Sequence, residues 1–161
     1  MRAESIGLRK YALFNDGGER VAILTYEGWL TYQAVAELEN GKKIQFDSQG
    51  FWGQTIEVKE EQELLATIKM DWFGNVKIFQ GKSENLLFTL KYTGFWQPKI
   101  LLQDSKKNKI AEFIGHFKWS KFTYDYEIIS FTKDVFEDIR NLLIAYFASM
   151  YLFRFISKSE V

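Results

Sequence analysis

The segment that decides the fold lies near the end of the sequence, at residues 141–153, and reads Asn-Leu-Leu-Ile-Ala-Tyr-Phe-Ala-Ser-Met-Tyr-Leu-Phe. It contains no charged residue, and as a helix it would present apolar side chains in every direction around its axis. A helix that is apolar on all sides must be surrounded by other apolar groups. The sequence therefore predicts a buried helix, with either lipid or protein around it.

The length of this segment favours protein over lipid. The thirteen residues between Arg140 and Arg154 span about 20 Å as a helix, whereas the hydrocarbon core of a bilayer is about 30 Å thick. Tyr146, Ser149 and Tyr151 also carry hydroxyl groups that need hydrogen-bond partners, which lipid does not provide. We expect a helix in the core of the protein and no transmembrane span.

The start of this helix is predicted at Asp134. Asp134 and Glu137, three residues later, fit a capping box, in which each side chain accepts a hydrogen bond from a backbone amide that the first turn leaves unpaired. Both acids would also lie at the positive end of the helix dipole. The predicted core helix covers residues 134–156.

Before the helix, the sequence has the two-residue period of β-strands. Apolar side chains alternate with polar ones over much of residues 66–72, 86–92 and 109–119. Strands with one apolar face are typical of antiparallel sheets. Turn-forming residues separate the runs, so about eleven strands are predicted before residue 130. Residues 34–38 fit a strand or a helical turn equally well.

The five tryptophans recur every 20 to 24 residues, which is the length of one β-hairpin. They are Trp29, Trp52, Trp72, Trp96 and Trp119. Each would mark an equivalent corner of a β-meander. Our default interpretation is that these large rings cover the ends or corners of a barrel. The alternative is a ring of aromatic side chains at one rim, suited to stacking on a ligand or to entering a membrane interface.

Composition excludes several classes of protein. The 161 residues are 47% hydrophobic and 17% aromatic, which predicts one soluble domain, residues 1–161, with its own core. Basic and acidic residues number 21 each, so no overall charge draws the protein to nucleic acid or to an anionic membrane, and any electrostatic binding must come from a local patch. The absence of cysteine excludes disulfides, and residues 1–10 lack the apolar segment of a secretory signal. We expect a cytoplasmic protein.

The sequence contains no catalytic motif. His116 is the only histidine, and no Gly-x-Ser-x-Gly sequence accompanies it. Asp125 and Glu127 share a strand face and are the candidates for a hydrolase that uses paired carboxylates, although such neighbours are usually solvated. Clusters of metal-ligating residues and phosphate-binding glycine loops are also missing. We expect a protein that is not an enzyme and that uses neither a metal nor a cofactor.

The order of these elements resembles the tubby-like superfamily, which includes the tubby C-terminal domain, the phospholipid scramblases and the plant LURP-one-related proteins. The resemblance rests on the hairpin at residues 99–110, on Lys118-Trp119, on residues 124–128 and on residues 142–147 of the helix. These segments look like the family's closing strands and core helix. The resemblance implies a mostly β (α+β) fold, a closed antiparallel barrel of about twelve strands around a central hydrophobic C-terminal helix.

The resemblance also implies a non-enzymatic binding or scaffold module, peripheral to the membrane, that contacts anionic phospholipid or phosphoinositide headgroups or a protein partner. No run matches the basic site of tubby, and the scramblase calcium segment and palmitoylated cysteines have no counterpart. The candidate headgroup residues are therefore lysine clusters: Lys106, Lys107, Lys109, Lys118 and Lys121. The other interpretation of these lysines is that they keep exposed strand edges from pairing.

Two further functions stay open. A lipocalin-like carrier of a small apolar ligand would have its C-terminal helix outside the barrel, with one polar stripe that residues 141–153 lack. A hydrolase that uses Asp125 and Glu127 would lose turnover when either acid is replaced.

Overall fold

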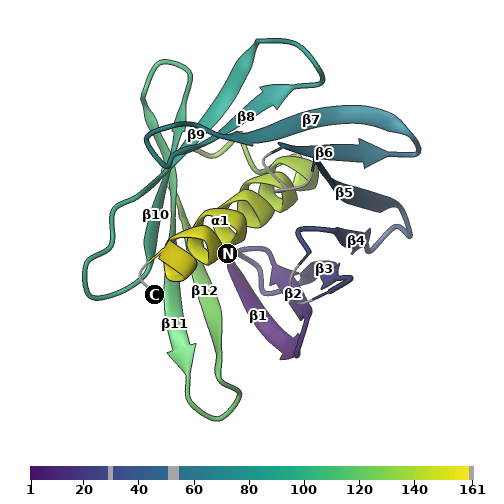
Figure 1. Cartoon of the computed structure of the whole chain (residues 1–161). Coiled ribbons are helices and arrows are strands. Elements are labelled where there is room, and N and C mark those ends of the chain that lie inside the picture. The colour runs from purple at the N-terminus through teal and green to yellow at the C-terminus, as the bar shows by residue number, and fades with distance from the viewer. Residues whose placement is uncertain (29–30, 51–54, 160–161) are drawn as a thin grey trace.

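The computed structural model describes residues 1–28, 31–50 and 55–159, with side chains up to residue 157. These residues form a closed antiparallel barrel of twelve strands around one helix (Figure 1). Each strand pairs with its neighbours in sequence, and β1 pairs with β12 to close the barrel. The elements are β1 (Arg2–Gly7), β2 (Lys10–Phe14), β3 (Arg20–Tyr26), β4 (Ala34–Leu38), β5 (Lys43–Gln49), β6 (Thr55–Glu60), β7 (Glu63–Met70), β8 (Val76–Gln80), β9 (Leu86–Tyr92), β10 (Lys99–Asp104), β11 (Lys109–Lys118), β12 (Thr123–Ser130) and α1 (Ile139–Ser159).

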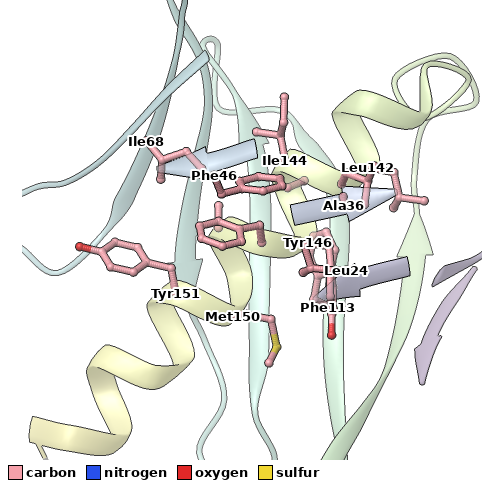
Figure 2. Packing of buried hydrophobic residues seen from close by; sticks show 14 of the residues in the cluster. Leu24, Ala36, Phe46, Ile68, Phe113, Leu142, Ile144, Tyr146, Met150 and Tyr151 are labelled. Carbon is pink, nitrogen blue, oxygen red and sulfur yellow. The ribbon is translucent and has the colours of Figure 1, made fainter. Parts of the chain in front are cut away.

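Helix α1 fills the interior of the barrel, as the sequence predicted. Every side chain of residues 142–152 is buried. The strands turn alternate apolar side chains toward it, and Figure 2 shows Leu24, Phe46 and Ile68, from three strands, around the helix. By length and composition alone, Ile139–Ser157 would also qualify as a membrane span. Here its apolar surface is covered by the barrel instead.

The helix begins at Ile139, so the predicted start at Asp134 was wrong. Asp138 is the capping residue, because its carboxylate accepts a hydrogen bond of 3.0 Å from the amide of Arg140. Asp134 and Glu137 form only a turn, in which the Glu137 amide donates to the Asp134 carbonyl at 3.3 Å. The reason is tertiary: after β12 the chain must first cross from the barrel wall to the barrel axis.

The strand predictions hold with two changes. Twelve strands form where about eleven were expected, and residues 34–38 form the strand β4. The alternating runs predicted at residues 66–72 and 109–119 end earlier than expected, because Trp72 and Trp119 lie just beyond the ends of β7 and β11. The alternation of apolar residues thus ends with the strand, and the next ring belongs to the loop.

Candidate functional site

The two ends of the barrel differ in what their loops carry. Since neighbouring strands are antiparallel, all loops that follow odd-numbered strands lie at one end, and all loops that follow even-numbered strands lie at the other. We call the first the aromatic end and the second the polar end. The helix runs between them: Arg140 pairs with Glu60 at the polar end, at 3.6 Å, and Arg154 lies 4.0 Å from the ring of Tyr26 at the aromatic end.

Large hydrophobic side chains project into solvent from four loops of the aromatic end. They are between 77% and 102% exposed: Leu8, Trp72, Phe73, Phe95, Trp96, Trp119 and Phe122. In the loops of the polar end, the described residues include one large hydrophobic side chain that is exposed, Phe131. Free apolar surface of this size, gathered at one end of a molecule, marks a surface that binds something.

The predicted corner positions are confirmed for Trp72, Trp96 and Trp119, which all lie in loops at the aromatic end. Trp29 and Trp52 lie outside the described residues. Our default interpretation, that the rings cover the barrel, is wrong for the three described tryptophans. A ring that packs against the barrel loses most of its accessible surface, and these rings keep theirs.

Lysines on β2 and on the five strands β7 to β11 lie directly behind the aromatic loops. At the aromatic end, the last two positions of the twelve strands contain six charged residues, and all six are lysines: Lys10, Lys69, Lys77, Lys91, Lys99 and Lys118. We call them the lysine collar. The last two positions at the polar end are mixed in charge, with five basic residues, Arg2, Arg20, Lys43, Lys59 and Lys109, and four acidic ones, Glu37, Glu60, Glu63 and Asp104. The two ends therefore differ in charge as well as in apolar surface.

Half of the collar is free of ion pairs. Lys10, Lys69 and Lys91 have no carboxylate partner in the part of the chain that the structure describes. The other three each have one: Lys118 with Asp125 at 2.7 Å, Lys77 with Asp71 at 3.4 Å, and Lys99 with Glu112 at 3.6 Å. The hydrogen bond that Lys118 donates to the Asp125 carboxylate raises the pKa of Lys118. All six collar lysines are at least partly exposed.

The predicted headgroup lysines do not form one site. Lys106 and Lys107 lie in the β10–β11 loop, and Lys109 begins β11, all at the polar end. Lys118 ends β11 and Lys121 lies in the following loop, at the aromatic end. Because β11 extends by about 3.3 Å per residue, the two groups are about 30 Å apart.

Lys118 and Lys121 help to close the barrel between β1 and β12. The register of these strands ends at Ala3 and Tyr126. Beyond it, the amide of Ser5 donates to Asp125 Oδ1 at 2.9 Å, and Lys121 Nζ donates to the Ser5 carbonyl at 3.0 Å. Lys118 binds the second oxygen of Asp125. Side-chain hydrogen bonds thus replace the backbone hydrogen bonds between β1 and β12 beyond Ala3 and Tyr126. We call this side-chain contact the seam.

The geometry gives no support to a hydrolase that uses Asp125 and Glu127. Both oxygens of Asp125 are engaged at the seam, as described above. Glu127 is more than half exposed, and its Oε2 lies 3.5 Å from Nε2 of His116, which is also half exposed. The other ring nitrogen of His116 lies 3.2 Å from the side-chain nitrogen of Gln97. The described residues contain no cluster of three metal-ligating side chains.

The position of the helix argues against a lipocalin-like carrier. It required α1 outside the barrel, whereas α1 occupies the interior. A hollow of about 510 Å³ does exist at the surface of the polar end. It is lined by polar residues, among them Asn40, Lys42, Lys43, Glu61 and Gln62, so it is unsuited to an apolar ligand.

The comparisons with known proteins found no relative: no family model, no curated protein and no solved structure matches the sequence. The function of the aromatic end therefore has to follow from its own residues. Exposed rings on loop tips, with lysines behind them, can bind a surface that is apolar inside and anionic at its boundary.

Proposed function

We propose that the protein is a non-enzymatic binding module, cytoplasmic and peripheral to the membrane, that attaches to anionic lipid through its aromatic end. One observation carries this proposal: the lysine collar lies directly behind loops tipped with exposed aromatic rings. Tryptophan prefers the depth of the headgroups, and lysine stems can follow apolar surface while their ammonium groups reach phosphates. An end-on approach would bring both kinds of side chain to the depth that suits them.

Charges at the two ends favour the same orientation. The loops of the aromatic end hold two basic and two acidic residues, Arg9 and Lys121 with Glu27 and Asp71. The loops of the polar end and the segment before α1 hold eight acidic and five basic residues: Asp16, Glu19, Glu39, Glu61, Glu84, Asp134, Glu137 and Asp138, with Lys42, Lys82, Lys106, Lys107 and Lys133. An anionic surface attracts the collar and repels the polar end.

The expected contributions to the binding free energy predict that salt weakens membrane binding but does not abolish it. A basic residue near an anionic membrane contributes about 1 kcal/mol, so the three unpaired collar lysines contribute about 3 kcal/mol at low salt. Physiological salt screens this part, because the Debye length is then about 8 Å. Burial of the exposed rings adds a hydrophobic part that screening does not reduce.

We also infer that the barrel is of the tubby-like type. The support is architectural: a closed barrel of twelve strands around a C-terminal helix is what the resemblance implies. In tubby domains, basic side chains on the barrel surface bind phosphoinositide headgroups. In this chain the collar would supply those charges, in place of the lysine clusters that are adjacent in sequence.

Cosedimentation of the full chain with vesicles tests the proposal. We expect binding to anionic and phosphoinositide-containing vesicles, weaker binding at physiological salt, and the least binding to neutral vesicles. Replacement of Lys10, Lys69 and Lys91 by Glu should lower binding to anionic vesicles strongly. The matched control replaces Lys42, Lys82 and Lys106 at the polar end by Glu, and it should bind like the wild type. Failure of the wild type to bind any vesicle would overturn membrane attachment and favour a protein partner or a soluble ligand.

A further inference from the structure

The β11–β12 hairpin extends beyond the strands on both sides of it at the aromatic end (Figure 1). Within the hairpin, pairing continues to Lys118 and Thr123. The pairing of β11 with β10 ends at Ile114, and the pairing of β12 with β1 ends at Tyr126. Residues 116–125 therefore have no paired strand alongside them, and we call this segment the finger.

A row of aromatic rings follows the inward-facing side of the finger and reaches the end of the helix. The ring of Tyr124 lies 5.0 Å from that of Phe153 on α1 and 5.1 Å from that of Phe117. The ring of Phe117 lies in turn 4.9 Å from Trp119 and 6.5 Å from Phe122. All four contacts are edge-to-face, and they connect the core to the tip of the finger.

The row of aromatic rings is buried at its inner end and exposed to solvent at its outer end. Tyr126 is buried and Tyr124 is half-buried, whereas Phe117 is 38% exposed and Phe122 is 81% exposed. At Gly115 a Cβ would lie 3.0 Å from Pro98 and 3.3 Å from the Tyr126 ring, so a side chain there would crowd the inner end of the row. The finger therefore carries a strip of free apolar surface that begins at the core and widens toward its tip.

We infer that this aromatic row binds the acyl chain of an anionic membrane lipid. The inference rests on the proposed membrane attachment and specifies one lipid contact within it. The row is only two rings wide where Phe117 and Tyr124 lie opposite each other in the register of β11 and β12. Such a narrow strip suits one extended chain, whereas a standard protein interface needs about 800 Å² on each partner. The row opens at the aromatic end, where the exposed rings of the other loops lie.

Charge at the tip of the finger fits the headgroup of such a lipid. Lys121 lies in the turn of the finger beside Phe122, and Lys118 lies on the opposite face of β11 from Phe117. Both lysines are exposed, and both already contact the protein, Lys118 at Asp125 Oδ2 and Lys121 at the Ser5 carbonyl. An ammonium group has three N–H donors, so each lysine keeps donors for a phosphate. A lipid with its chain along the row would have its phosphate within reach of these two ammonium groups.

The test uses a single-chain anionic lysolipid below its critical micelle concentration, so that no bilayer is present. We expect saturable binding by the wild type, with quenching of tryptophan fluorescence when the chain is brominated. Phe117→Ser should weaken this binding by about tenfold or more, because the chain loses its central ring contact. Phe122→Ser, at an exposed position, should weaken it as well and provides a second variant that leaves the core unchanged.

Phe95→Ser is the matched control, because Phe95 is an exposed ring on another loop of the same end. It should leave lysolipid binding unchanged and lower vesicle binding. If the wild type binds anionic vesicles but no monomeric lysolipid, or if Phe117→Ser and Phe122→Ser bind lysolipid like the wild type, the acyl-chain site is refuted and membrane attachment stands. Failure of the wild type to bind vesicles would instead refute the proposed function.

Discussion

The ring of Phe147 on α1 lies nearly flat against the ring of Phe46 on β5, with centroids 4.2 Å apart and planes at 17°. Tyr26 on β3 stacks on the same helix ring, at 5.8 Å and 21°. All three rings are buried. A ring near the middle of the helix is thus in contact with two strands of the barrel wall, and this contact fixes the helix inside the barrel.

Phe147→Ala should lower the free energy of unfolding by about 3–5 kcal/mol, because it leaves a cavity between helix and wall. Phe147→Asp should abolish folding, because an unpaired buried charge costs as much as a typical domain's whole stability. Urea unfolding followed by circular dichroism measures both. Phe95→Ala, at an exposed ring, should change stability by less than about 0.5 kcal/mol. A stable, folded Phe147→Asp variant would show that the helix is not the core.

Asp138→Ala should lower stability by about 1 kcal/mol at neutral pH, because Asp138 caps α1. Hydrogen bonds from the side chain of Arg140 lower the pKa of Asp138. This stabilisation is therefore fully present above the ordinary aspartate pKa, near about 4, and is lost as the pH falls through the lowered value. Asp134→Ala should have little effect on stability. A larger loss of stability in Asp134→Ala than in Asp138→Ala would show that Asp134 caps the helix, as the sequence predicted.

Asp125→Ala should lower stability by about 1–3 kcal/mol, because it leaves the amide of Ser5 unpaired at the seam. Glu127→Ala should cost less than about 0.5 kcal/mol, since Glu127 is mostly exposed. Thermal unfolding of the two variants distinguishes a structural role of Asp125 from membership of a carboxylate pair. Equal and negligible effects would mean that side chains do not hold the seam.

The hydroxyl groups of Tyr26, Tyr126 and Tyr146 are buried and lack a hydrogen-bond partner among the described residues. Burial raises the pKa of each above its usual value. Above about pH 10 the unfolded chain releases protons that the folded protein keeps. The contribution of these tyrosines to stability should therefore be constant below that pH, and stability should fall above it by up to about 1.4 kcal/mol per pH unit for each tyrosine.

Urea unfolding between about pH 9 and 11 measures this slope. Tyr146→Phe should remove up to about 1.4 kcal/mol per pH unit from this slope, since it removes one of the ionisable groups, and it should not lower stability at neutral pH. An unchanged slope in this variant would show that Tyr146 can ionise in the folded protein.

The helix and the strands could be predicted because their signals are local. Residues 141–153 are apolar around the whole helix axis, and strand alternation is visible in short runs. The start of the helix could not be predicted in this way. The capping pattern at Asp134 and Glu137 is valid locally, but the path of the chain from β12 to the barrel axis uses those residues as a turn.

The candidate site was harder to predict because it is assembled from distant strands. Lys10 and Lys99 are far apart in sequence, and neither has a lysine of the collar beside it. Clusters such as Lys106-Lys107 are conspicuous in sequence, yet they lie at the other end of the barrel from Lys118. One signal was present: in an antiparallel meander, the ends of odd strands and the starts of even strands share one end.

The orientation of the protein on the membrane is the central claim, and site-specific fluorescence tests it most directly. Because the sequence has no cysteine, one introduced cysteine can carry an environment-sensitive fluorophore at a single site. We would label Phe95→Cys at the aromatic end and Ser105→Cys at the polar end, both exposed, and add anionic vesicles. We expect a blue shift for the label at position 95 and none for the label at position 105. A shift at position 105 alone, or at neither position while the protein cosediments, would contradict this orientation.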